Sequence, residues 1–313
     1  MIHRLDPDNP SPDRDPDLER AAARRQRRRR RAALIRERGR AAMVRGVHFL
    51  PSLATLGNVL CGFSAMYACT FASGNQSYDP WARALLAEPL LTAVYLILFA
   101  AFFDVLDGRL ARMTRHTTDF GGQLDSLADV ISFGCAPAFI CLQLFHRLGD
   151  VPLVVTRLVW CLGMLYVACA AIRLARFNVT NVHAEQAHRS FQGLPSPAAA
   201  MAALAVVLVH EELALDGYES AARTVIWGII PVLLSTALLM VSELRYPHLM
   251  NTMLRGRKSV FKLVAGLIVI LLLVLRHRYV IAFAALAFLV AGPLYWWQLR
   301  RASAQPKAPT PAV

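Results

Sequence analysis

The sequence has 313 residues, of which 56% are hydrophobic, and its formal net charge is +13 at pH 7. Its mean hydropathy of +0.41 is too high for an ordinary soluble domain. Apolar runs long enough to span about 30 Å of hydrocarbon recur along the chain. We therefore expect an all-α fold, a polytopic bundle of membrane helices.

The first 44 residues are rich in arginine and lack an apolar core, so we expect a disordered cytoplasmic tail. The segment from Arg24 to Arg31 is basic at every position except Gln26. Such a run is able to bind nucleic acid. Beside a membrane span, we favour attraction to anionic headgroups and a topology signal, with no nucleic-acid partner.

About eight transmembrane helices are predicted. Their expected ranges are Leu50–Ser73, Pro89–Arg112, Gly121–Phe145, Pro152–Ala175, Pro195–Leu215, Val225–Glu243, Phe261–Leu275 and Tyr279–Leu299. We divide the chain into the tail at 1–44, a membrane core at 45–249, a C-terminal helix pair at 250–300 and a second tail at 301–313. The last two helices are separated at Arg276-His277-Arg278.

The distribution of lysine and arginine predicts the orientation. Basic residues gather before the first helix, in the second, fourth and sixth connections, and after the last helix. The other connections are poorer in bases, and the fifth contains Glu211, Glu212, Asp216 and Glu219. By the positive-inside rule, both termini face the cytoplasm. Arg276 and Arg278 are the exception to this pattern.

Four aspartates lie at the facing ends of the second and third helices. They are Asp104, Asp107, Asp125 and Asp129. An ionised carboxylate at bilayer depth costs at least about 2.5 kcal/mol, and acidic residues there are functional by default. Spacings of three and four residues place each pair on one helix face. Hard oxygen ligands at this density suit two divalent cations, Mg²⁺ or Mn²⁺, on the side of the membrane open to cytoplasmic solutes.

The residues between the aspartates belong to the same pattern. The full motif reads D-x-x-D-G-x-x-A-R, eight residues, then G-x-x-x-D-x-x-x-D. Acids at helix ends often lie in solvent, but eight specified positions match by chance at roughly one start in billions. Gly108, Ala111 and Gly121 leave room for a bulky ligand near the backbone. Arg112 is placed to neutralise phosphate oxygens.

This motif resembles the complete signature of the CDP-alcohol phosphatidyltransferase family. The resemblance implies an integral membrane enzyme that transfers a phosphatidyl or similar group from a CDP-linked donor to an alcohol and releases CMP. It also implies that Asp104, Asp107 and Asp125 bind a dinuclear metal site, and that Asp129 is the general base and also contacts a metal. The residues Gly108, Ala111, Arg112 and Gly121 then form the surface that binds the CDP donor.

Two further regions bear on the acceptor alcohol. The segments Leu50–Phe63, Arg173–Val179 and Phe191–Pro197 resemble the membrane-bound phosphatidylserine synthases of this family. The resemblance implies CDP-diacylglycerol and L-serine as substrates. Arg173 and Arg176 share a helix face and are candidates to hold the serine carboxylate. The positive-inside bias alone also explains arginines there. Asn58, on an apolar helix, needs a partner, either the donor or a neighbouring helix backbone.

Alternatives remain at this point. The same chemistry with glycerol 3-phosphate or an inositol phosphate requires a dense basic pocket for the acceptor phosphate. A non-enzymatic cation carrier requires acidic residues staggered across the bilayer, whereas here they gather on one side. We expect a bacterial inner-membrane protein with its active site facing the cytoplasm, and the family resemblance suggests a homodimer.

Overall fold

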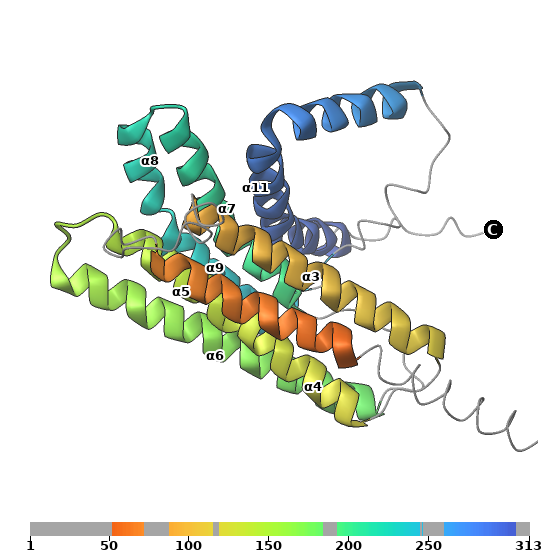
Figure 1. Cartoon of the computed structure of the whole chain (residues 1–313). Coiled ribbons are helices and arrows are strands. Elements are labelled where there is room, and N and C mark those ends of the chain that lie inside the picture. The colour runs from red at the N-terminus through yellow and green to blue at the C-terminus, as the bar shows by residue number, and fades with distance from the viewer. Residues whose placement is uncertain are drawn as a thin grey trace, which may run out of the picture. The chain divides into compact units, whose positions relative to one another are not determined.

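Every regular element in the part of the chain that the computed structural model describes is a helix (Figure 1). The described residues are 52–71, 88–114, 119–183, 193–244, 246 and 260–304. Contacts divide the chain into residues 1–50 and 51–313, and all described residues belong to the second unit. The expected Arg-rich tail therefore lies outside the described residues, as do residues 305–313 at the other end.

Seven described helices are long and apolar enough to cross a membrane. They are Ser52–Thr70, Pro89–Leu110, Phe120–His146, Leu153–Val179, Ser196–Leu215, Glu219–Val241 and Leu271–Gln298. The prediction of an all-α, polytopic membrane bundle is confirmed, and the first six spans match the expected ranges to within a few residues at most of their ends. Apolar runs of this length are stable across a bilayer only as helices, because lipid offers the backbone no hydrogen-bond partners.

The elements that carry the aspartates lie together in the bundle. The Ser52–Thr70 helix precedes α3 (Pro89–Thr114). A continuous rod then follows, built from α4 (Asp119–Asp129), the π-helix η2 (Val130–Cys135) and α5 (Ala136–His146). This rod contacts α3 and the long helix α6 (Leu153–His183), so that these helices run alongside one another (Figure 1).

Helix α7 (Ser196–Leu215) is the central helix of the bundle. It contacts α3, α5, η2 and three later helices, and nearly every residue from Ala199 to Leu208 is buried. Its sequence begins SPAAAMAALA, and small side chains of this kind allow neighbouring helices to approach closely. The turn before it is fixed by Gly193, whose φ of +84° favours glycine and whose added Cβ would lie 2.5 Å from the Met240 carbonyl oxygen.

Helices α8 (Glu219–Ile226) and α9 (Ile229–Val241) together form the sixth span. Helix α9 packs along α6, and both α8 and α9 contact α7. The sixth span is therefore bound to the bundle by both of its helices, and the Leu194 N–H, just before α7, donates to the Leu239 carbonyl oxygen of α9 at 3.0 Å.

The expected C-terminal pair forms one bent helix, α11 (Val260–Ala304). Its backbone leaves helical geometry at Arg276 (φ −145°, ψ 50°), and Figure 1 shows two arms that meet there at a sharp bend. The first arm has about 16 residues and spans only about 24 Å, less than the hydrocarbon core. The structure therefore gives seven candidate spans among its described residues in place of the predicted eight.

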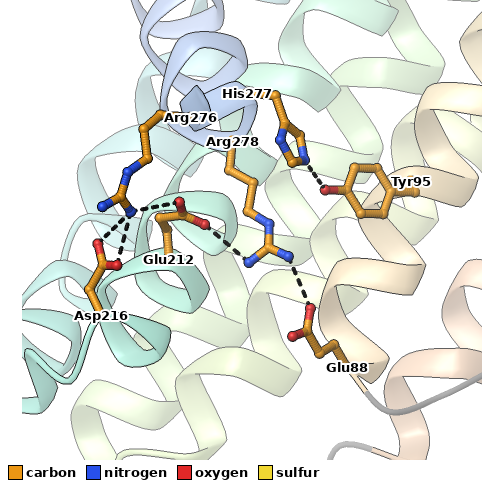
Figure 2. A network of polar contacts seen from close by, with 7 residues as sticks. All are labelled: Glu88, Tyr95, Glu212, Asp216, Arg276, His277 and Arg278. Carbon is orange, nitrogen blue, oxygen red and sulfur yellow. Dashed lines mark hydrogen bonds and ion pairs between the residues drawn. The ribbon is translucent and has the colours of Figure 1, made fainter. Parts of the chain in front are cut away.

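The bend of α11 inserts two arginines between acidic side chains (Figure 2). Arg276 Nη1 lies 2.8 Å from Asp216 Oδ2 and 3.2 Å from Glu212 Oε1. Arg278 Nη1 lies 3.0 Å from Glu212 Oε2, and its Nη2 lies 3.2 Å from Glu88 Oε2. These ion pairs join α11 to α7 and to the start of α3. They also explain why arginines occur here against the positive-inside pattern, because acidic side chains neutralise them.

Candidate functional site

Three of the four predicted aspartates converge in the structure. Asp104 and Asp107 lie on α3 and Asp125 lies on α4, and one carboxylate oxygen from each lies within 4.8 Å of the others. Spacing of three residues brings the α3 pair onto one face, and the rod places α4 opposite it. Two ionised carboxylates at this distance repel each other by about 3 kcal/mol at an effective dielectric constant of 20. The cluster therefore requires positive charge.

The donor atoms fit divalent cations. Asp125 Oδ1 is buried and has no hydrogen-bond partner, although an unpaired buried oxygen is costly. Asp107, only 5% exposed, accepts a hydrogen bond from Thr55 Oγ1 through Oδ2 at 3.0 Å, so its orientation is fixed. Carboxylate oxygens are the ligands that Mg²⁺ and Mn²⁺ prefer. The residues present thus match the expected metal chemistry.

Asp129 lies one helical turn beyond Asp125, at the end of α4, and has a different environment. It is buried and is not one of the three carboxylates that share the 4.8 Å cluster. Its Oδ1 accepts a hydrogen bond of 3.1 Å from Asn58 Nδ2. The structure thus gives Asp129 a protein partner of its own, and its expected contact with a metal stays a prediction.

Asn58 and two hydroxyl residues form the second layer of this site. Asn58 is fully buried, and its backbone carbonyl accepts a hydrogen bond of 2.9 Å from Ser132 Oγ. Sequence reasoning assigned a role to neither Thr55 nor Ser132. A signal was available for Thr55, because it lies three residues before Asn58 and both are polar positions on one face of an apolar helix. Ser132 gave no such signal.

The expected donor-binding positions lie on α3 and α4. At Gly108 an added Cβ would meet no other atom within 4 Å, so open space lies beside this residue. Gly121 lies in α4, four residues before Asp125. Ala111 and Arg112 belong to the last turns of α3, and their side chains lie outside the described part of the structure. The space at Gly108 agrees with the predicted room for a bulky ligand.

The two arginines proposed for the acceptor have different surroundings. Arg173 is partly buried, Nη1 donates to Ser196 Oγ, and Nε is buried without a hydrogen-bond partner. Its charge also interacts with those of Asp104 and Asp129. Arg176 is exposed and lies 3.7 Å from Glu243 Oε1 through Nη2. The structure therefore brings Arg173, rather than Arg176, toward the aspartates.

Comparison with known proteins agrees with this arrangement. The family model described as CDP-alcohol phosphatidyltransferase matches residues 48–235, more than half of the chain. The chain belongs to the CDP-alcohol phosphatidyltransferase family. All four aspartates, Asn58 and Arg173 lie within the matched residues, whereas α11 lies beyond them. The family resemblance inferred from the aspartate motif is therefore confirmed, and the chain is an enzyme of the phosphotransferase class.

Several relatives within this family carry one printed name, CDP-diacylglycerol–serine O-phosphatidyltransferase. The protein of Methanocaldococcus jannaschii is 36% identical over 162 residues, which cover 52% of this chain and 67% of that protein. A Helicobacter pylori protein is 31% identical over 206 residues, or 66% of this chain and 74% of its own length. The Saccharomyces cerevisiae protein is 33% identical over 164 residues, or 50% of this chain and 52% of its own.

Proposed function

We propose that this enzyme transfers the phosphatidyl group of CDP-diacylglycerol to L-serine, giving phosphatidylserine and CMP. The observation that carries the proposal is the convergence of Asp104, Asp107 and Asp125 within 4.8 Å, in a chain of this family. The names of the relatives from three organisms support serine as the acceptor.

The three clustered carboxylates would hold two divalent cations, Mg²⁺ or Mn²⁺. Such ions neutralise the diphosphate of the donor and make its phosphorus more electrophilic. The protein's own contribution is orientation, because Thr55 fixes Asp107 and the spacing on α3 and α4 fixes the other two ligands. Gly108, Ala111, Arg112 and Gly121 then surround the CDP moiety, with open space at Gly108 for its approach.

Asp129 is the general base of the proposed reaction. It takes the proton of the serine hydroxyl while that oxygen attacks the phosphorus that carries diacylglycerol. A carboxylate is a weak base for an alcohol, so the proton transfers as the oxygen–phosphorus bond forms. Asp129 is suited to this role because a hydrogen bond from Asn58 holds one of its oxygens, while the other is not committed to that bond.

Arg173 is the residue that we propose to bind the serine carboxylate. Its guanidinium has an unused buried Nε and makes no ion pair with a carboxylate among the described residues. Arginine binds carboxylates through two parallel hydrogen bonds. Arg176 shares the helix with Arg173, but its guanidinium already lies near Glu243, so we assign it a lesser part in acceptor binding.

The surroundings of the enzyme follow from its charge pattern. We propose a multi-pass protein of a bacterial inner membrane, and the positive-inside rule supports a site that faces the cytoplasm. The arginines of residues 1–44 then attract anionic headgroups. We also propose that the enzyme forms a homodimer, as the family resemblance suggests.

A head-group competition assay tests the proposal. Purified enzyme receives labelled CDP-diacylglycerol and Mg²⁺ or Mn²⁺, with serine, glycerol 3-phosphate and an inositol phosphate as competing acceptors. We expect labelled phosphatidylserine and CMP in equal amounts, and no product after treatment with EDTA. A product formed mainly from a phosphorylated acceptor would exclude serine specificity. Full activity in metal-free buffer would exclude the metal site.

A further inference from the structure

Asn58 lies directly behind the proposed base. Its Nδ2 donates to Asp129 Oδ1 at 3.1 Å, and the contact joins the first described helix to the end of α4. Asn58 has no exposed surface. Its Oδ1 is buried without a hydrogen-bond partner, and its expected contact with the donor stays a prediction. Its Nδ2 contacts the residue that we propose as the general base.

The rod that carries Asp129 also holds Asn58 in place. Ser132 lies in η2, three residues after Asp129, and its Oγ donates to the Asn58 carbonyl oxygen at 2.9 Å. The two helices are very close here, because a Cβ added at Gly62 would overlap Ser132 Oγ. Asn58 therefore bonds to two residues of one rod, one through its side chain and one through its backbone.

The π-helix that contains Ser132 is fixed from a third side. Tyr166 of α6 is fully buried, and its hydroxyl donates to the Phe133 carbonyl oxygen at 2.9 Å. Short π-helical segments interrupt the regular hydrogen bonds of α-helices and are frequent at functional sites. Here the segment starts at the residue after Asp129, and contacts from two neighbouring helices determine where it lies.

We propose that Asn58 is a positioning residue for Asp129. It occupies Oδ1 and thereby directs Oδ2 toward the acceptor hydroxyl. In the reaction, the serine oxygen forms a bond to the phosphorus that carries diacylglycerol, and the bond from that phosphorus to the CMP oxygen breaks. The serine proton passes to Asp129 Oδ2. Ser132 supports this geometry by holding the backbone of Asn58. The inference rests on the proposed role of Asp129 as base.

Kinetics separate positioning from donor binding. We expect Asn58→Ala to lower kcat by about 10- to 100-fold, the effect of a small misplacement of a reacting group. The KM for CDP-diacylglycerol should stay within about threefold, because a misplaced base slows the chemical step without changing donor binding. We also expect CDP with Mn²⁺ to raise the Tm of the variant as much as that of the wild type. An unchanged kcat with a raised KM and no response to CDP would overturn the proposal.

Two further variants complete the test. Ser132→Ala removes only the hydrogen bond to the Asn58 carbonyl oxygen. This variant should lower kcat by about 3- to 10-fold with an unchanged KM. If Asn58→Ala does not fold, this variant decides, and an unchanged kcat would overturn the inference. Ser126→Ala is the matched control, because Ser126 Oγ bonds Asn178 of α6 from the same rod without touching Asp129. Its kcat should stay within about twofold.

The same assay distinguishes a failure of serine specificity from a failure of the positioning role of Asn58. CMP release is measured with serine and with other alcohols. If the wild-type enzyme does not use serine, serine specificity fails, and the three variants are then compared on the alcohol that the wild type accepts. The ratio of kcat between the variants and the wild type tests the role of Asn58 in either case.

Discussion

Two groups of charged side chains lie toward opposite ends of α3. In one group the carboxylates form ion pairs with arginines, and in the other they do not. Near the end of the helix, Asp104 and Asp107 meet Asp125 without an ion pair to any described side chain. At its start, Glu88 belongs to a network in which Glu212 and Asp216 face Arg276 and Arg278 (Figure 2). Glu88 and Asp104 are 16 positions apart, which corresponds to about 24 Å along a helix. Each carboxylate of the second group therefore has an arginine partner, whereas the three clustered aspartates have no ion pair among the described residues.

The two partly buried arginines show the same contrast. Arg278 and Arg173 each have a buried Nε without a hydrogen-bond partner. Both terminal nitrogens of Arg278 lie near carboxylates, whereas the described partner of Arg173 is a hydroxyl, Ser196 Oγ. A guanidinium near carboxylates that it does not pair with keeps charge for an anionic ligand. Our proposal therefore assigns binding to the charges of the first region, and the ion pairs of the second region join α11 to α7 and α3.

The largest expected effect on activity comes from removing one charge from the cluster of Asp104, Asp107 and Asp125. Asp125→Asn keeps the shape of the side chain but removes a carboxylate whose Oδ1 is buried and unpaired. We expect kcat/KM to fall by about 1000-fold or more, since electrostatic stabilisation is the largest single contribution to such catalysis. Folding should be retained, because mutual repulsion in the cluster decreases. Activity within tenfold of the wild type would show that Asp125 is not a ligand.

The arginine of the site should affect the acceptor selectively. Arg173→Gln removes the charge near Asp104 and Asp129, and we expect the KM for serine to rise by about 10- to 100-fold. The KM for CDP-diacylglycerol should change little. Steady-state kinetics with each substrate varied in turn measure both constants. A rise in the donor KM alone would assign Arg173 to the donor.

A change in the ion-pair network around Arg276 and Arg278 should affect stability and not catalysis. Glu212→Gln removes the carboxylate that joins both arginines, of which Arg278 is the less exposed, at 17%. We expect a loss of about 1–3 kcal/mol in the free energy of unfolding, because a partly buried charge loses its partner. Tm should fall by several degrees while kcat remains within about twofold. A large loss of kcat at an unchanged Tm would contradict this division of roles.

The smallest effect tests the open space beside the cluster. Gly108→Ala adds a methyl group that meets no atom within 4 Å, and alanine is favoured over glycine inside a helix by about 1 kcal/mol. We therefore expect an unchanged or higher Tm, together with a rise of about 3- to 10-fold in the KM for CDP-diacylglycerol as the methyl group meets the donor. An unchanged KM would show that the donor does not approach Gly108.

The sequence predicted most of the bundle because the signals were local. Apolar runs separated by polar residues predicted six spans correctly. Spacing within the helices predicted that all four aspartates share one space, and three of them, Asp104, Asp107 and Asp125, converge within 4.8 Å. The bent α11 was predicted as two spans, because hydropathy does not show that Arg276 and Arg278 are neutralised by acids of other helices. Contacts between distant segments leave no periodic pattern in either segment.

The second layer of the site was not predictable for the same reason. Asn58 and Asp129 are 71 positions apart, and Asn58 and Ser132 are 74 apart. Nothing in either segment alone indicates these partners. Asn58 was expected to bond either to the donor or to the backbone of a neighbouring helix. In the structure its Nδ2 donates to the side chain of Asp129. The π-helix that places Ser132 opposite Asn58 has no recognisable sequence pattern here.

The central claim, that the three clustered carboxylates hold divalent cations, is tested most directly by binding of Mn²⁺ measured by electron paramagnetic resonance. The purified protein is titrated with Mn²⁺ in the presence of CDP, beside the Asp125→Asn and Glu212→Gln variants. We predict two bound ions per chain in the wild type and in Glu212→Gln, with spin coupling between them, and loss of this binding in Asp125→Asn. Free Mn²⁺ throughout the titration, or equal binding in all three proteins, would contradict the claim.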